Sequence, residues 1–171
     1  MFHPTIFENL KVAFENRIYD LDSLDGKIDI LNRIDRMDFA IMKRDFALRF
    51  ALLGEPDVTV EVVLEASLQE LADEILENER AHPGSALRLR FRKRVEDSEK
   101  TCKKITEALA AIWEDDVEIK QTLSRELDDK KVGELDTILV KFKPKLDEEH
   151  IEEIPEFLEH VLESLAALNK L

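Results

Sequence analysis

Residues 17–53 read RIYDLDSLDGKIDILNRIDRMDFAIMKRDFALRFALL, and apolar and polar side chains alternate on both sides of Asp25-Gly26. An Asp-Gly pair in such a setting is a strong β-hairpin signal, because glycine supplies the positive φ of a tight turn. We therefore predict strands at residues 17–22, 27–35 and 45–52. The apolar side chains that share one face of the third strand are Phe46, Leu48, Phe50 and Leu52.

The segments on either side of this stretch predict two helices and a further strand. A capping box formed by Thr5 and Glu8 begins a helix over residues 5–15, and Ile18 and Leu21 can extend its apolar stripe beyond this end. Residues 58–64 are rich in β-branched side chains and predict a strand. A second capping box, Ser67 with Glu70, begins a helix that we expect to end near residue 81. The residues that we expect on the inner face of this helix are Leu68, Leu71, Ile75 and Leu76.

The second half of the chain continues with alternating strands and helices. Residues 87–95 predict a strand, and a helix follows from about residue 97. Residues 117–127 fit either a strand or a continuation of that helix, and we favour a strand that pairs with residues 135–143. Asp147 caps a final amphipathic helix, in which Pro155 should cause a break or kink.

Strands joined by short turns indicate an antiparallel sheet, with the helices stacked against it. The predicted fold is therefore α+β, a single domain over residues 1–171. We expect a sheet of five to six strands with amphipathic helices packed mainly on one face.

The composition limits the kind of partner. A formal net charge of −14 on 171 residues disfavours nucleic acid and anionic membranes, since the field of the protein repels phosphate. The single cysteine and the lack of a signal-peptide pattern predict a cytoplasmic protein, and no apolar run is long enough to span a membrane. A protein partner or self-association remains the expected mode of interaction.

Four arginines form the main basic feature of this acidic chain. Arg88, Arg90, Arg92 and Arg94 share one face of the strand at residues 87–95, opposite Leu87, Leu89 and Phe91. Guanidinium groups in such a row can bind phosphates, carboxylates or an acidic peptide. They can equally form cross-strand ion pairs with carboxylates on neighbouring strands, for which the candidates are Asp29, Asp35, Asp45 and Glu61.

We find no pattern that indicates catalysis, a metal site or a cofactor. Glu156 and His160 are four residues apart on the last helix, but that helix is rich in glutamate throughout, so the spacing is weak support for a metal. Cys102 lies on an apolar helix stripe, as a free cysteine usually does. The glycines are scattered and form no phosphate-binding loop.

These observations favour a non-enzymatic binding, adaptor or chaperone-like protein that acts through a protein–protein surface. The order of elements resembles that of small acidic secretion chaperones, which hold basic or apolar segments of client proteins; the resemblance is one of architecture and includes no shared motif. One alternative is a sensor or enzyme for an anionic ligand on the arginine-lined face, with His82 nearby. Another is a structural homodimer that uses the apolar stripe of the last helix.

Overall fold

The computed structural model describes residues 5–78, 80–128 and 130–171. Four α-helices and six strands follow one another in the order α1 (Ile6–Ser23), β1 (Ile28–Asp38), β2 (Lys43–Leu52), β3 (Glu55–Ala66), α2 (Leu68–Ile75), β4 (Ala86–Val95), α3 (Ser98–Trp113), β5 (Val117–Ser124), β6 (Glu134–Phe142) and α4 (Ile154–Asn169). Short 3-10 helices, Glu114–Asp116 and Glu148–Glu153, precede β5 and α4.

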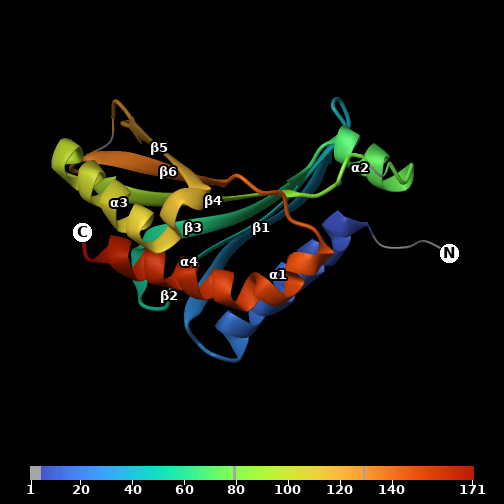
Figure 1. The fold of residues 1–171 in the computed structure, drawn as a ribbon. Helices are drawn as coiled ribbons and strands as arrows, with labels where there is room; N and C mark the ends of the chain where they lie inside the picture. Colours follow the sequence, from blue (N-terminus) through green and yellow to red (C-terminus); the bar gives the residue numbers. More distant parts are fainter. Residues whose placement is uncertain (1–4, 79, 129) are drawn as a thin grey trace.

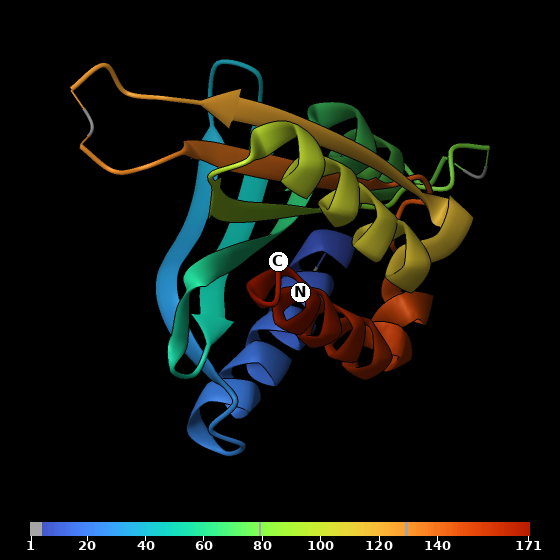
Figure 2. The same ribbon diagram turned by 90° about the vertical axis from the view of Figure 1, so that its left-hand side faces the viewer.

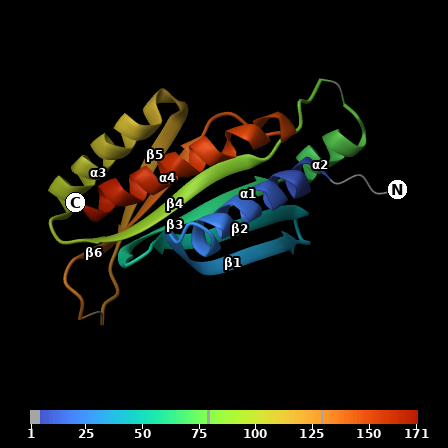
Figure 3. The same ribbon diagram turned by 90° about the horizontal axis from the view of Figure 1, so that it is seen from below.

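The six strands form one antiparallel sheet in the order β1-β2-β3-β4-β6-β5. Helices α1, α3 and α4 lie on one face of this sheet, and none of the described helices covers the other face (Figures 1 and 3). Figure 2 shows the strong twist of the sheet, in which β1 and β2 run across the direction of β5 and β6. The predicted α+β architecture is confirmed, including the strand over residues 117–124.

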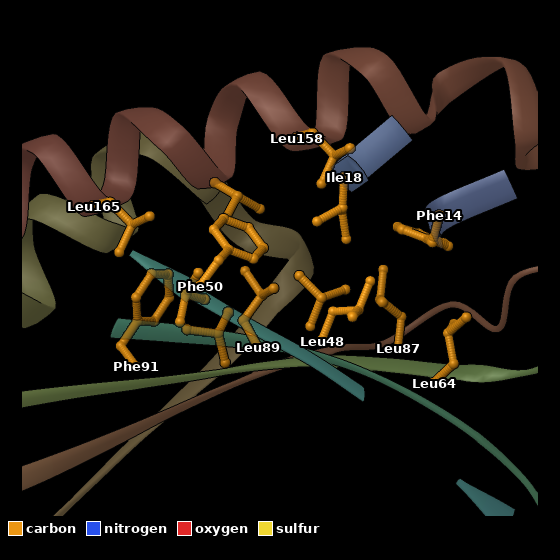
Figure 4. Packing of buried hydrophobic residues seen from close by; sticks show 14 of the residues in the cluster. Phe14, Ile18, Leu48, Phe50, Leu64, Leu87, Leu89, Phe91, Leu158 and Leu165 are labelled. Carbon is orange, nitrogen blue, oxygen red and sulfur yellow. The ribbon is translucent and has the colours of Figure 1, made fainter. Parts of the chain in front are cut away.

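The core lies between the sheet and the helices (Figure 4). Phe46, Leu48 and Phe50 on β2 face this layer, as their alternation predicts. The helices contribute apolar stripes, such as Phe14 and Ile18 of α1. Burial of this apolar surface supplies the main stabilisation of the fold.

The strand predicted at residues 17–22 is wrong, because this segment is the C-terminal part of α1. Ile18 continues the buried stripe of the helix, and the Lys27 N–H donates to the Leu21 carbonyl where the helix closes. Gly26, at φ +61°, therefore forms the exit from a helix and not a β-hairpin turn.

The helical run that Asp147 caps is divided near Pro155, as predicted. A 3-10 helix, Glu148–Glu153, comes first, and α4 begins at Ile154 with Pro155 in its first turn, where a missing N–H costs nothing. A further boundary differs from the prediction. Helix α2 ends at Ile75 and not near residue 81. Glu77 directly after it takes a positive φ of 51°, a conformation that stops a helix.

Candidate functional site

The four predicted site arginines project from β4 on the face of the sheet that carries no helix. Their partners in the register show this, since Leu89 and Phe91 between them are fully buried on the opposite face. Arg88 forms an ion pair with Glu65, and Arg90 forms one with Glu61, both on β3. These two arginines therefore link neighbouring strands through ion pairs, which is the structural alternative predicted from the sequence.

The same ion-pair network continues to the edge of the sheet. Lys43 Nζ on β2 lies 3.0 Å from Glu65 Oε1 and 3.5 Å from Asp45 Oδ1. Arg36 Nε on β1 lies 3.1 Å from Asp45 Oδ2. Small residues beneath this layer, such as Ala47 and Val63, are buried although no helix covers them. The long side chains therefore shield the sheet with their apolar stems.

Arg92 and Arg94 have different surroundings. Arg92 lies between Thr59 of β3 and Thr137 of β6 in the register. It forms no ion pair with any residue that the structure describes. Arg94 Nη1 lies 3.4 Å from the Gly133 carbonyl oxygen, to which it donates. Arg88 and Arg90 thus form cross-strand ion pairs with glutamates, whereas Arg92 and Arg94 lie near the end of β4.

The end of β4 borders a cavity with a volume of about 700 Å³. Its charged lining residues are Asp57, Arg92, Lys93, Arg94, Glu96 and Lys131. Four of these are basic and two are acidic, so this concavity carries a local excess of positive charge. His82, the histidine expected near the row, lies before β4 begins, at the opposite end of the strand.

Helix α2 forms a second candidate surface, because it is attached to the protein through its acidic side. Glu74 Oε1 accepts a hydrogen bond from the Ile6 N–H at 2.8 Å. Glu70 Oε2 accepts one from the Gly84 N–H at 2.9 Å, and Glu70 also pairs with Lys145. These contacts fix one side of the helix and determine which side faces outward.

The predicted inner face of α2 is for the most part its outer face. Leu68, Ile75 and Leu76 are 51%, 72% and 76% exposed, and only Leu71 packs against the core. No residue of the helix is fully buried. The amphipathic pattern predicts the helix correctly. However, the contacts of Glu70 and Glu74 hold its polar side against the protein, so most of its apolar side faces outward.

The hairpin that joins β1 and β2 adds further apolar side chains at the same end of the sheet. Phe39 and Ile41 are 80% and 60% exposed, and Met42 is also exposed. The hairpin extends just beyond the pair Arg44–Ala66, where β3 ends and α2 follows. Figure 1 shows the hairpin tip and α2 at one end of the molecule. We call the set Phe39, Ile41, Met42, Leu68, Ile75 and Leu76 the apolar end.

The apolar stripe of α4, which is the surface suggested for a homodimer, faces the core. Ile154, Leu158, Val161, Leu165 and Leu168 are all buried. Trp113 of α3 donates from Nε1 to Ser164 Oγ at 2.9 Å and locks the two helices together. The stripe therefore closes the core against the sheet.

Cys102 and His160 have structural surroundings in the described part of the chain. Burial, and next the nearby Asp136 carboxylate, raise the pKa of Cys102 to about 11, so its thiol stays protonated near neutral pH. The His160 ring packs edge-on against Trp113. Within residues 5–78, 80–128 and 130–171, no three His, Cys, Asp or Glu side chains are grouped as a metal site, and no helix is long and apolar enough to cross a membrane.

Comparison with protein-family models, with curated proteins and with solved structures gave no match. Fold and surface together define an acidic α+β protein with an exposed apolar end and, at the other end of its sheet, a basic concavity.

Proposed function

We propose that the protein is a non-enzymatic binding protein that holds a basic amphipathic segment of a partner protein against its apolar end. The observation that carries this proposal is the exposure of six large apolar side chains at one end of a protein with a net charge of −14. Isolated exposed apolar residues are common, but a group of this size marks an interaction surface.

The attachment of α2 supports this role. An amphipathic helix normally turns its apolar side towards the core. Here, hydrogen bonds to Glu70 and Glu74 attach the polar side instead, and Leu68 and Ile75 remain in water. This arrangement leaves apolar area exposed that a docked partner would bury, with a gain of roughly 1.5–3 kcal/mol for each fully covered side chain.

Charge determines which partner fits. The acidic surface attracts cations over a distance of about one Debye length, roughly 8 Å at physiological ionic strength. Asp73 and Glu77 lie on or next to α2 and can contact a basic side chain at its rim. A segment with apolar residues on one side and lysine or arginine on the other satisfies both features of this surface.

A direct test measures binding of a fluorescein-labelled amphipathic peptide made of leucine and lysine by fluorescence anisotropy. We expect binding that weakens with salt, and loss of at least about 10-fold in affinity for the double variant Ile75→Ser, Leu76→Ser, because two apolar contacts disappear. Leu127→Ser is the matched control, since Leu127 is 95% exposed in the loop at the opposite end of the sheet.

Equal binding by the double variant and the control variant would overturn the proposal. So would equal binding of a peptide in which glutamate replaces lysine. Size-exclusion chromatography distinguishes the homodimer, because a dimer of the native chain that becomes monomeric in the double variant would make a second copy the occupant of the apolar end.

A further inference from the structure

The basic concavity at the end of β4 is a second surface, distinct from the apolar end. It is formed where the start of β3, the end of β4 and the start of β6 come together, and its lining includes Asp57, Thr59 and Leu135. Its volume of about 700 Å³ is that of a small-molecule site. The apolar end lies at the other end of the same strands (Figure 1).

Arg92, which lines this concavity, differs from the preceding arginines of β4 in its neighbours on the adjacent strands. Arg88 and Arg90 on the same face are each paired with a glutamate of β3. The positions beside Arg92 on β3 and β6 are instead threonines, Thr59 and Thr137. A guanidinium group flanked by hydroxyl groups provides several donors on one side of the sheet, and no described carboxylate forms an ion pair with it.

We propose that this concavity binds a small phosphorylated molecule, with the phosphate group on Arg92. A phosphate carries a charge of about −1.5 to −2 and three strong acceptor oxygens, which match the paired donors of a guanidinium group. Lys93, Arg94 and Lys131 add positive charge to the lining. These groups offset, at short range, the repulsion that the net charge of the chain exerts on an anion.

The shape and charge of the lining also describe the rest of the ligand. A single phosphate ion fills only a small part of about 700 Å³. Asp57 and Glu96 are the two acidic groups of the lining, and they can accept hydrogen bonds from hydroxyl or amino groups. The ligand class is therefore an organic phosphate that bears hydrogen-bond donors away from its phosphate, such as a sugar phosphate, and not a long polyanion.

Isothermal titration calorimetry with ribose 5-phosphate, inorganic phosphate and ribose tests this site at constant ionic strength. We expect the affinity to fall in that order, with ribose not binding. Arg92→Gln should weaken ribose 5-phosphate by about 10-fold or more, because charge-assisted hydrogen bonds are lost. Arg36→Gln is the matched control, since it removes the same charge from the same face of the sheet, on the edge strand β1.

Failure of ribose 5-phosphate to bind would overturn this proposal, as would an equal loss of affinity in the Arg92→Gln and Arg36→Gln variants. A melting temperature of Arg92→Gln close to that of the native protein shows that the variant is folded when its binding is measured. Because the amphipathic peptide is not used here, the outcome is independent of the function proposed for the apolar end.

Discussion

The thiol of Cys102 on α3 donates a hydrogen bond to the carboxylate of Asp136 on β6, with Sγ 3.5 Å from Oδ2. Asp136 is fully buried, and its Oδ1 has no hydrogen-bond partner among the described residues. Burial raises the pKa of Asp136, and the hydrogen bond from Cys102 only partly opposes this effect. The surroundings of Asp136 beneath α3 therefore disfavour the ionised form of its carboxyl group.

The Asp136→Asn variant should be more stable than the native protein near pH 7. A carboxyl group whose pKa is raised by folding favours the folded state less as the pH rises above its unfolded value, about 4. Removing this group should gain about 1–2 kcal/mol, or about 3–6 °C in melting temperature. The gain should shrink as the pH approaches about 4, and Asp128→Asn, an exposed change of equal charge, should show neither effect.

The ion pair between Arg90 and Glu61 gives a second prediction. Glu61 is only 5% exposed, so Arg90→Gln leaves a nearly buried carboxylate without this partner. We expect a loss of about 2 kcal/mol in the free energy of unfolding, measured with urea, and recovery of most of it in the double variant Glu61→Gln, Arg90→Gln. Arg92→Gln should change stability by less than about 0.5 kcal/mol. Equal losses for Arg90→Gln and Arg92→Gln would contradict the division of the row.

Gly133 should tolerate no side chain. Its φ is +87°, and a Cβ atom there would lie 2.2 Å from the Val95 carbonyl oxygen. We expect Gly133→Ala to cost about 2–3 kcal/mol, because strain at positive φ adds to a clash with the backbone. Gly54→Ala is the control, since Gly54 has φ +78° but no atom within 4 Å of the added Cβ. Its cost should be about 1 kcal/mol, and an equal cost at both sites would rule out the clash.

Lys11 should make the protein sensitive to acid. Its Nζ lies 3.0 Å from both Glu8 Oε2 and Asp35 Oδ2. Burial alone would raise the pKa of these carboxyls, but hydrogen bonds and charge from Lys11 and Arg44 outweigh it and lower both values. The stability that the two groups contribute is therefore present above about pH 4.5 and is lost as the pH falls through their lowered values.

Melting curves of the Lys11→Met variant between about pH 3 and 7 measure this contribution. We expect a loss of about 1 kcal/mol, or about 2–4 °C, at neutral pH and convergence with the native protein at the acid end. Lys104→Met, an exposed change on α3, should follow the native curve throughout. A constant difference at all pH values would contradict the link to Glu8 and Asp35.

Local patterns in the sequence were sufficient to predict most of the sheet. Leu87, Leu89 and Phe91 alternate with arginines, and the strand forms with these three side chains buried. When helices cover one face of a sheet and solvent covers the other, a strand with this alternation can bury its apolar side chains in only one orientation. The orientation of the arginines on β4 follows from the same alternation.

One feature was ambiguous in the local patterns, and a second depends on contacts between residues far apart in the chain. Asp25-Gly26 satisfies a hairpin and a helix exit equally well, because both need a residue with positive φ. The spacing of Phe14 and Ile18 within α1 was the signal that favoured the helix. The orientation of α2 depends on contacts of Glu70 and Glu74 with residues far along the chain, Ile6, Gly84 and Lys145, and these contacts exist only in the folded protein.

The candidate site was only partly predictable for the same reason. The sequence identifies the arginine row, but the cross-strand register decides that Arg88 and Arg90 meet glutamates while Arg92 meets threonines. A shift of the pairing between β3 and β4 by two residues would exchange these partners. The exposed side of α2 had no separate signal, since buried and exposed apolar stripes have the same spacing.

Strand β3 runs over twelve residues from the basic concavity to the base of α2, a length of about 40 Å. A docked helix of about 14 residues is only about 21 Å long, so it cannot cover both places. The proposed peptide and the proposed organic phosphate can therefore bind together without steric conflict. We expect saturation of one proposed site to leave the binding isotherm of the other unchanged, because the strand length between them is several times the Debye length of roughly 8 Å.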